Sequence, residues 1–294
     1  MIGLANYVMR GRLQALMVIL AVASSMMIVS TMFCWISAAV VALITLRKGV
    51  AEGAWLLMWA VLPAGLLLLY VGDSGPLAML VGAMALALVL RATVSLPATV
   101  LASIAVGGVT GLALVAFGGQ FLDQLVEFFA EFLGNLEQQL SQGEGEAVVL
   151  DRPTTLQIAG MLGSVNAASA VMCLLLARYW QAALYNPGGF GEEFRALYLT
   201  PAMTATLVLP ALVVFALGVE YRTWAVIFMV PLTFAGLALV HARAKRRGQG
   251  KGWLTGFYLA WLLLDPVKLI VVATAIADSW IGFRQRWAKQ AGED

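Results

Sequence analysis

The chain is poor in charged residues, histidine and cysteine. Only 12% of its 294 residues are Asp, Glu, Lys or Arg, whereas a soluble domain carries roughly 25%. Its single histidine, His241, excludes zinc sites built on paired histidines and argues against histidine-dependent catalytic triads. Cys34 and Cys173 both lie in apolar runs, so we expect two buried apolar side chains and neither a disulfide nor a metal site.

Motifs for ATP hydrolysis and for nucleophilic catalysis are missing as well. There is no Gly-x-x-x-x-Gly-Lys-Ser/Thr loop and no Gly-x-Ser-x-Gly elbow. Asp265 and Asp278 lack any flanking motif that would support a pair of catalytic aspartates. The sequence therefore predicts a protein that is not an enzyme and uses no cofactor.

Long apolar runs dominate the sequence instead. Hydrophobic residues make up 62% of the chain, and the mean hydropathy is +0.90. As one helix, the run 13–46 would be roughly 50 Å long, whereas the hydrocarbon core of a bilayer is about 30 Å thick. A polar notch of Ser24, Ser25, Ser30 and Thr31 interrupts this run. We therefore predict two short helices that join at the notch.

The last long run, 253–287, carries charged residues inside otherwise apolar sequence. Such groups are costly in lipid, so they normally face protein or a wet cavity. Asp265 followed by Pro266 is a helix-start signal, in which a capping side chain precedes a proline. Lys268 lies three residues later and can pair with Asp265 on one helical face. Two interpretations stay open: a pocket floor or ion-coupled site, and a capped helix start at an aqueous boundary.

Small and polar residues mark where other apolar segments should pack. Gly107, Gly108 and Gly111 in segment 96–117 allow close helix packing, and Asn166 in segment 156–176 would be costly against lipid. The fold predicted is all-α: a polytopic transmembrane helix bundle with some short or re-entrant helices and one extramembrane amphipathic helix. Further membrane segments are expected at 54–71, 77–90, 197–219 and 224–240.

The amphipathic helix is predicted at 121–140. Its apolar residues recur at helical spacing, while Asp123, Glu127 and Glu131 share the opposite, solvated face. A flexible acidic linker follows at 142–146. The predicted divisions are an N-terminal transmembrane half (1–118), a periplasmic amphipathic helix with its acidic linker (119–152) and a C-terminal transmembrane half (153–294).

The distribution of basic residues predicts the topology. A layout of ten segments with both termini in the cytoplasm of a bacterial cell leaves only Arg152 and Arg222 outside the inner membrane, and Lys268 within it. The basic loop 241–252 then reflects topology; it is short and lacks the interleaved aromatics of a nucleic-acid site. We expect Asp278 to pair with Arg284 or with the basic residues of 243–247.

Two stretches resemble a known family. Asn186-Pro-Gly-Gly-Phe-Gly-Glu-Glu-Phe-Arg195 and Asp278-Ser-Trp-Ile-Gly-Phe-Arg284 resemble the YybS-like family of predicted bacterial inner-membrane proteins. That family looks distantly similar to the substrate-binding S components of energy-coupling-factor transporters and to the cell-shape protein MreD. The resemblance implies a helical membrane domain and is compatible with a small-molecule pocket near its outer face. S components dock to a partner through Ala-xxx-Ala surfaces, and Ala38-Ala39-Val-Val-Ala42 offers one.

Two functions follow from these patterns. The first is an S-component-like protein in the lipid bilayer that binds a small solute without its own ATPase and passes it to a separate energising module. The second is a structural partner of envelope proteins, resembling MreD, that docks through segments 121–140 and 241–252. For the first, the candidate binding residues are Gly107, Gly108, Asn166, Asp265 and Lys268.

Overall fold

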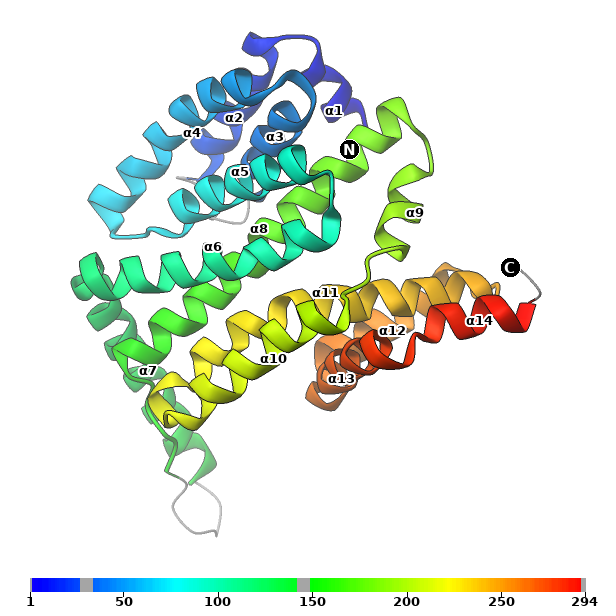
Figure 1. The fold of residues 1–294 in the computed structure, drawn as a ribbon. Helices are drawn as coiled ribbons and strands as arrows, with labels where there is room; N and C mark the ends of the chain where they lie inside the picture. The colour runs from blue at the N-terminus through cyan, green and yellow to red at the C-terminus, as the bar shows by residue number, and fades with distance from the viewer. Residues whose placement is uncertain (1, 27–33, 142–148, 292–294) are drawn as a thin grey trace.

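The computed structural model describes residues 2–26, 34–141 and 149–291, and all the regular secondary structure in these ranges is helical (Figure 1). The all-α prediction is therefore confirmed. The helices are α1 Ile2–Met9, α2 Arg12–Met26, α3 Cys34–Lys48, α4 Val50–Val71, α5 Gly75–Thr93, α6 Leu96–Phe117, α7 Gly119–Leu140, α8 Thr155–Tyr185, α9 Gly189–Arg195, α10 Pro201–Ala216, the short 3-10 helix η2 Val219–Tyr221, α11 Arg222–Arg246, α12 Lys251–Leu263, α13 Asp265–Ile281 and α14 Phe283–Ala291.

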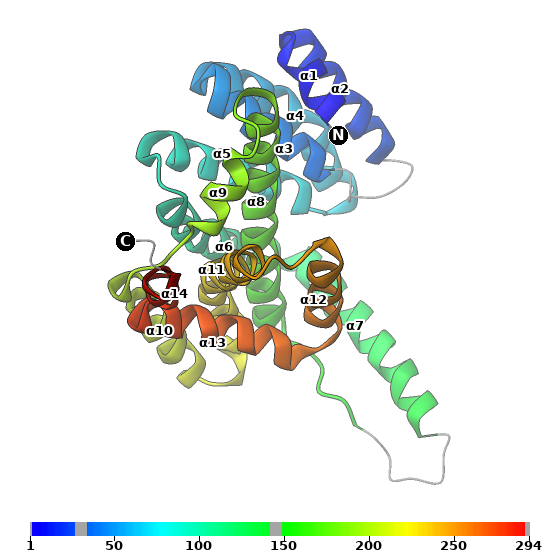
Figure 2. The same cartoon turned by 90° about the vertical axis from the view of Figure 1, so that its right-hand side faces the viewer.

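Helix α8 is the axis of the bundle. It is 31 residues long and begins with a capping box, in which Thr154 and Gln157 satisfy each other's backbone N–H groups. It packs against α3, α5 and α6 on one side and against α11 on another (Figures 1 and 2). The predicted C-terminal half thus contributes its first helix to the core of the N-terminal half.

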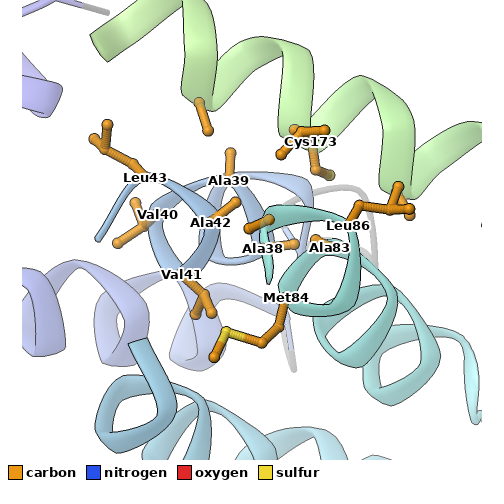
Figure 3. Close-up of a cluster of buried hydrophobic side chains, with 14 of the residues drawn as sticks. Ala38, Ala39, Val40, Val41, Ala42, Leu43, Ala83, Met84, Leu86 and Cys173 are labelled. Atoms are coloured by element: carbon orange, nitrogen blue, oxygen red, sulfur yellow. The ribbon is translucent and has the colours of Figure 1, made fainter. Parts of the chain in front are cut away.

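Helix α3 is buried along most of its length, from Ser37 to Thr45. Figure 3 shows its alanine and valine side chains packed against α5 and α8. The whole stretch Ala38–Ala42 has no exposed surface. The docking surface predicted there is therefore wrong, because the small residues pack α3 against its own bundle and cannot face a partner. Cys34 and Cys173 are both free and buried, as expected.

The predicted close packing is confirmed at Gly107 and Gly111 of α6 but not at Gly108, which has nothing within 4 Å of an added Cβ. A Cβ atom on Gly107 would lie 2.8 Å from the backbone oxygen of Gly163 in α8, and one on Gly163 would lie 2.6 Å from the oxygen of Gly107. Gly111 is equally confined, with Trp224 of α11 at 2.8 Å from its added Cβ. The backbones of α6 and α8 approach this closely only because neither carries a side chain there.

The apolar run 13–46 contains two helices, α2 and α3, that pack against each other, as predicted. Of the four notch residues, Ser24 and Ser25 lie within α2, while Ser30 and Thr31 lie outside the described residues. The run at 253–287 is also broken: α12 and α13 meet at an angle of 110°. Since α12 has 13 residues and is about 20 Å long, it is too short to cross a hydrocarbon core of about 30 Å.

The cap predicted at Asp265 is wrong in its detail. Leu264 takes an extended conformation at the bend and occupies the cap position, so Asp265 becomes the first residue of α13 and makes no capping bond. Its carboxylate instead accepts a hydrogen bond from Lys268 Nζ at 2.8 Å, which confirms the predicted pairing. The predicted pair of Asp278 with Arg284 is also present, at 3.4 Å.

Helix α7 is amphipathic, as predicted, and extends away from the other helices (Figure 2). Asp123, Glu127 and Glu131 are exposed. The opposite face packs only in part against α6 and α8, and Phe128 and Phe132 remain 60% and 55% exposed. The linker 142–146 lies outside the described residues.

The chain is an integral membrane protein with several crossings. Five helices in the described part are long and apolar enough to span a bilayer: α4, α5, α6, α8 and α11 together with η2. The bent pair α12–α13 brings the count to six, while α10 and the start of α2 are shorter apolar helices. Ten segments and the orientation of the termini stay predictions.

We predict that neighbouring glycines of α6 respond oppositely to a methyl group. Gly107→Ala should lower the free energy of unfolding by about 1–3 kcal/mol, because the Cβ meets backbone atoms that cannot move aside. Gly108→Ala is the matched control: nothing lies within 4 Å of its Cβ, so alanine should be neutral or stabilising by up to about 1 kcal/mol. Unfolding in mixed detergent measures both variants, and equal losses would contradict the packing described here.

Candidate functional site

A groove of about 600 Å³ opens on the side of the bundle between α4, α5, α6 and the start of α7. Its walls come from small and branched apolar side chains, including Val81 and Ala85 of α5 and Val106 and Val109 of α6. Such a surface suits the apolar part of a ligand. Because these helices are candidate membrane spans, the groove lies at membrane depth.

One end of the groove is polar. Ser74 and Thr110 line it there, and Phe121 borders both the groove and two adjoining cavities. The smaller cavity, of about 100 Å³, is lined by Asp73, Asn166 and Ser169 among others. The other, of about 290 Å³, is lined by Tyr70, Gln120 and Gln124 beside apolar residues. The site is thus amphipathic.

A tight turn builds the polar end. Helix α4 ends at Gly72, whose φ of 76° is the left-handed conformation that glycine adopts without strain. Asp73 Oδ1 then accepts a hydrogen bond from the backbone N–H of Gly75 at 2.8 Å, which fixes the carboxylate at the start of α5. Of the described residues that line the three cavities, only Asp73 is charged. The site therefore disfavours an anionic ligand.

Asn166 lies where the sequence predicted, between helices and 7% exposed. Its Nδ2 donates to Thr110 Oγ1 of α6 at 2.8 Å and to the backbone oxygen of Ala78 in α5 at 3.3 Å. Thr110 in turn donates to the backbone oxygen of Val106 at 2.7 Å. These bonds join three helices at the wall of the groove, so Asn166 supports the site as well as lining its smaller cavity.

The other candidate binding residues lie apart from this site. Gly107 of α6 is packed against α8 and α11, and Gly108 lines none of these cavities. Asp265 and Lys268 belong to α13, which packs mainly on α10, α11 and α12. The structure therefore brings Asn166 and Gly107 onto facing helices and does not bring the Asp265–Lys268 pair to them.

Sequence reasoning missed Asp73, Thr110 and Phe121 as parts of a site. Asp73 lies in a Gly-Asp-Ser-Gly-Pro stretch that indicates a turn, and Phe121 is one of many periodic apolar residues. Thr110 lies between the packing glycines, three residues after Gly107. That position was the available signal, because a hydroxyl beside a close helix contact is well placed to bond the facing helix.

Comparison with known protein families, with curated proteins and with solved structures finds no match to this chain.

We predict that the Asn166–Thr110 contact stabilises the bundle modestly. Asn166→Ala should lower the free energy of unfolding by about 1 kcal/mol, since buried interhelical hydrogen bonds in membranes average about 0.6 and reach about 1.7 kcal/mol. In a double-mutant cycle with Thr110→Val, measured by unfolding in detergent, the two losses should be less than additive. Fully additive losses would contradict a direct bond between these side chains.

Proposed function

We propose that this protein binds a small neutral or cationic amphiphile in the groove between α4, α5, α6 and α7, in the manner of a transporter S component. The observation that carries the proposal is the combination of an apolar groove at membrane depth with a polar end whose one charge is the Asp73 carboxylate. An apolar chain would fill the groove, and a hydroxyl or amine would lie at Ser74, Thr110 and Asp73. The YybS-like resemblance supports the same function.

In this proposal the protein has no ATPase of its own, and any energy for release comes from a separate module. Since Ala38–Ala42 is buried, that module would have to contact another surface. Among the described helices, α12 offers such a surface because it has no buried residue.

The orientation proposed for the protein places the groove's polar end outside the inner membrane of a bacterium and both termini in the cytoplasm. The turn at Asp73 and the acidic face of α7 then lie on the outer side, while Arg243, Lys245 and Arg246 lie inside. This orientation fits a protein that takes up its ligand from outside.

We predict that a cysteine at position 131 reacts from outside the cell and one at position 246 does not. Glu131 and Arg246 are both exposed, and the two native cysteines are buried, so Glu131→Cys and Arg246→Cys serve as single reporters. A membrane-impermeant maleimide should label the first in intact cells and the second only after permeabilisation. Equal or reversed labelling would overturn the proposed orientation.

We predict that filling the groove weakens the binding of a neutral amphiphile. Farnesol should stabilise the purified protein in a thermal unfolding assay, as should dodecylamine, while laurate should not, because its carboxylate would meet Asp73. Val109→Trp places an indole in the groove and should raise the Kd for farnesol at least about tenfold, or about 1.4 kcal/mol.

Leu112→Trp is the matched control for this experiment. Leu112 lies on the same helix and is 62% exposed, against 67% for Val109, but does not line the groove. Farnesol should bind this variant as it binds the parent protein. Equal weakening in both variants, or no stabilisation by any of the three amphiphiles, would contradict the proposed function.

A second function, that of a scaffold resembling MreD in an envelope assembly, is favoured by one observation. Phe128 and Phe132 are more than half exposed on a helix that extends from the bundle, and a partner helix could cover them (Figure 2). Purification of the native complex separates the two functions: the first expects an ATP-hydrolysing module and the second expects envelope proteins.

A further inference from the structure

A second large cavity, of about 750 Å³, lies at the C-terminal end of α8, where α9 turns back between α8 and α11. Figure 1 shows this region at the end of α8 that is remote from α7. The cavity is lined from α1, α8, α9 and α11, and we call it the α9 cleft. Most residues of the Asn186–Arg195 stretch line this cleft, and neither proposed function assigns a role to that stretch.

Specific contacts hold α9 in place. Arg178 of α8 forms an ion pair with Glu193, with Nε at 3.2 Å from Oε2. At the end of α9, Arg284 donates from Nη1 to the backbone oxygen of Arg195 at 2.9 Å. Gly188 opens the helix with a φ of 92°, which favours glycine. Three parts of the chain thus fix the wall of the cleft.

The wall of the cleft is aromatic. Phe190 and Phe194 of α9 stack with their ring centres 6.0 Å apart, and Tyr179 lies against Phe190 at 6.1 Å. Phe194 contacts the ring of His241 at 5.5 Å, and His241 Nε2 bonds the hydroxyl of Tyr258 at 2.8 Å. Rings of this kind lie at the interface between lipid and water.

The charge of the cleft is positive. Arg195 and Lys245 line it, and neither forms an ion pair within the described ranges. Glu192 also lines the cleft, whereas Glu193 is neutralised by Arg178. The guanidinium of Arg195 lies over Gly191, where a Cβ would be 2.9 Å from Nη1. The missing side chain leaves room for that placement.

We propose that the α9 cleft binds the phosphate group of an anionic phospholipid. The planar guanidinium of Arg195 can hold two phosphate oxygens, and Lys245 adds a point charge. In the proposed orientation the cleft lies on the cytoplasmic side of the membrane, where basic pockets between helices suit such head groups. The aromatic wall and the apolar side chains of Ile2 and Ala183 would contact the glycerol and upper acyl chains. This site is distinct from the groove and does not depend on its function.

The test uses the full-length protein in detergent and counts retained lipids by native mass spectrometry. Phosphatidylglycerol should bind more tightly than phosphatidylcholine, which carries no net charge. Arg195→Gln with Lys245→Gln should weaken phosphatidylglycerol binding about fivefold for each cation, or about 25-fold together. Arg195→Lys, which keeps the charge, should lose less than Arg195→Gln.

The matched control is Arg246→Gln with Arg247→Gln, which removes the same charge from exposed residues outside the cleft. It should leave phosphatidylglycerol binding nearly unchanged, and thermal unfolding should show that both double variants remain folded. Equal weakening in the two double variants would mean general attraction to the basic surface and would overturn the site. If millimolar inorganic phosphate alone displaced phosphatidylglycerol, the cleft would be a site for a soluble phosphate ester. That result would overturn the proposal of a lipid ligand.

Discussion

The close contact of α6 with α8 is the constraint on which the rest of the structure depends. In lipid there is no hydrophobic force between apolar helices, so packing must come from close backbone approach and from polar contacts. Gly107 and Gly163 provide the first, and Asn166 with Thr110 provides the second. The two are linked, because the short side chain of Asn166 reaches Thr110 only across a narrow interface. Through α8, the same contact joins the N-terminal helices to α11.

The groove is a consequence of how α5 meets this pair. Gly82 of α5 fits against α6 and α8, where a Cβ would lie 2.7 Å from Val106 and 3.3 Å from the Cβ of Ala170. On the lipid side, Ala85 and Ala105 line the groove with side chains too small to fill it. A bundle held by small residues is therefore dense along its axis and hollow at its edge. The polar turn at Asp73 closes one end of that hollow.

The sequence located most of the long apolar helices but did not show which of their faces are buried. Helix α6 begins and ends at the residues of the apolar segment 96–117, and the break at Leu264 was visible from Asp265 and Pro266. Burial at Ala38–Ala42 was not visible, because an alanine is equally apolar against lipid and against protein. Of the candidate binding residues, Asn166 could be placed since its amide must find partners. Asp265 and Lys268 bond each other, so their charges do not require a partner on another helix. The sequence therefore could not predict which helices lie beside them.

Both cavities form where the chain folds back on itself, and the spacing of apolar residues in the sequence does not predict such tertiary contacts. The polar end of the groove forms only because Phe121 of α7 packs over the turn at Gly72. A Cβ atom added to Gly72 would lie 3.7 Å from the Phe121 ring. The α9 cleft needs α9 to fold back onto α8, which Arg178 secures through Glu193. The surroundings of the two cavities differ in charge: α7, beside the groove, carries Asp123, Glu127 and Glu131, whereas the end of α11, beside the cleft, carries Arg243, Lys245 and Arg246. Since basic residues favour the cytoplasmic side, this asymmetry supports the proposed orientation, in which the two cavities lie at opposite surfaces of the membrane.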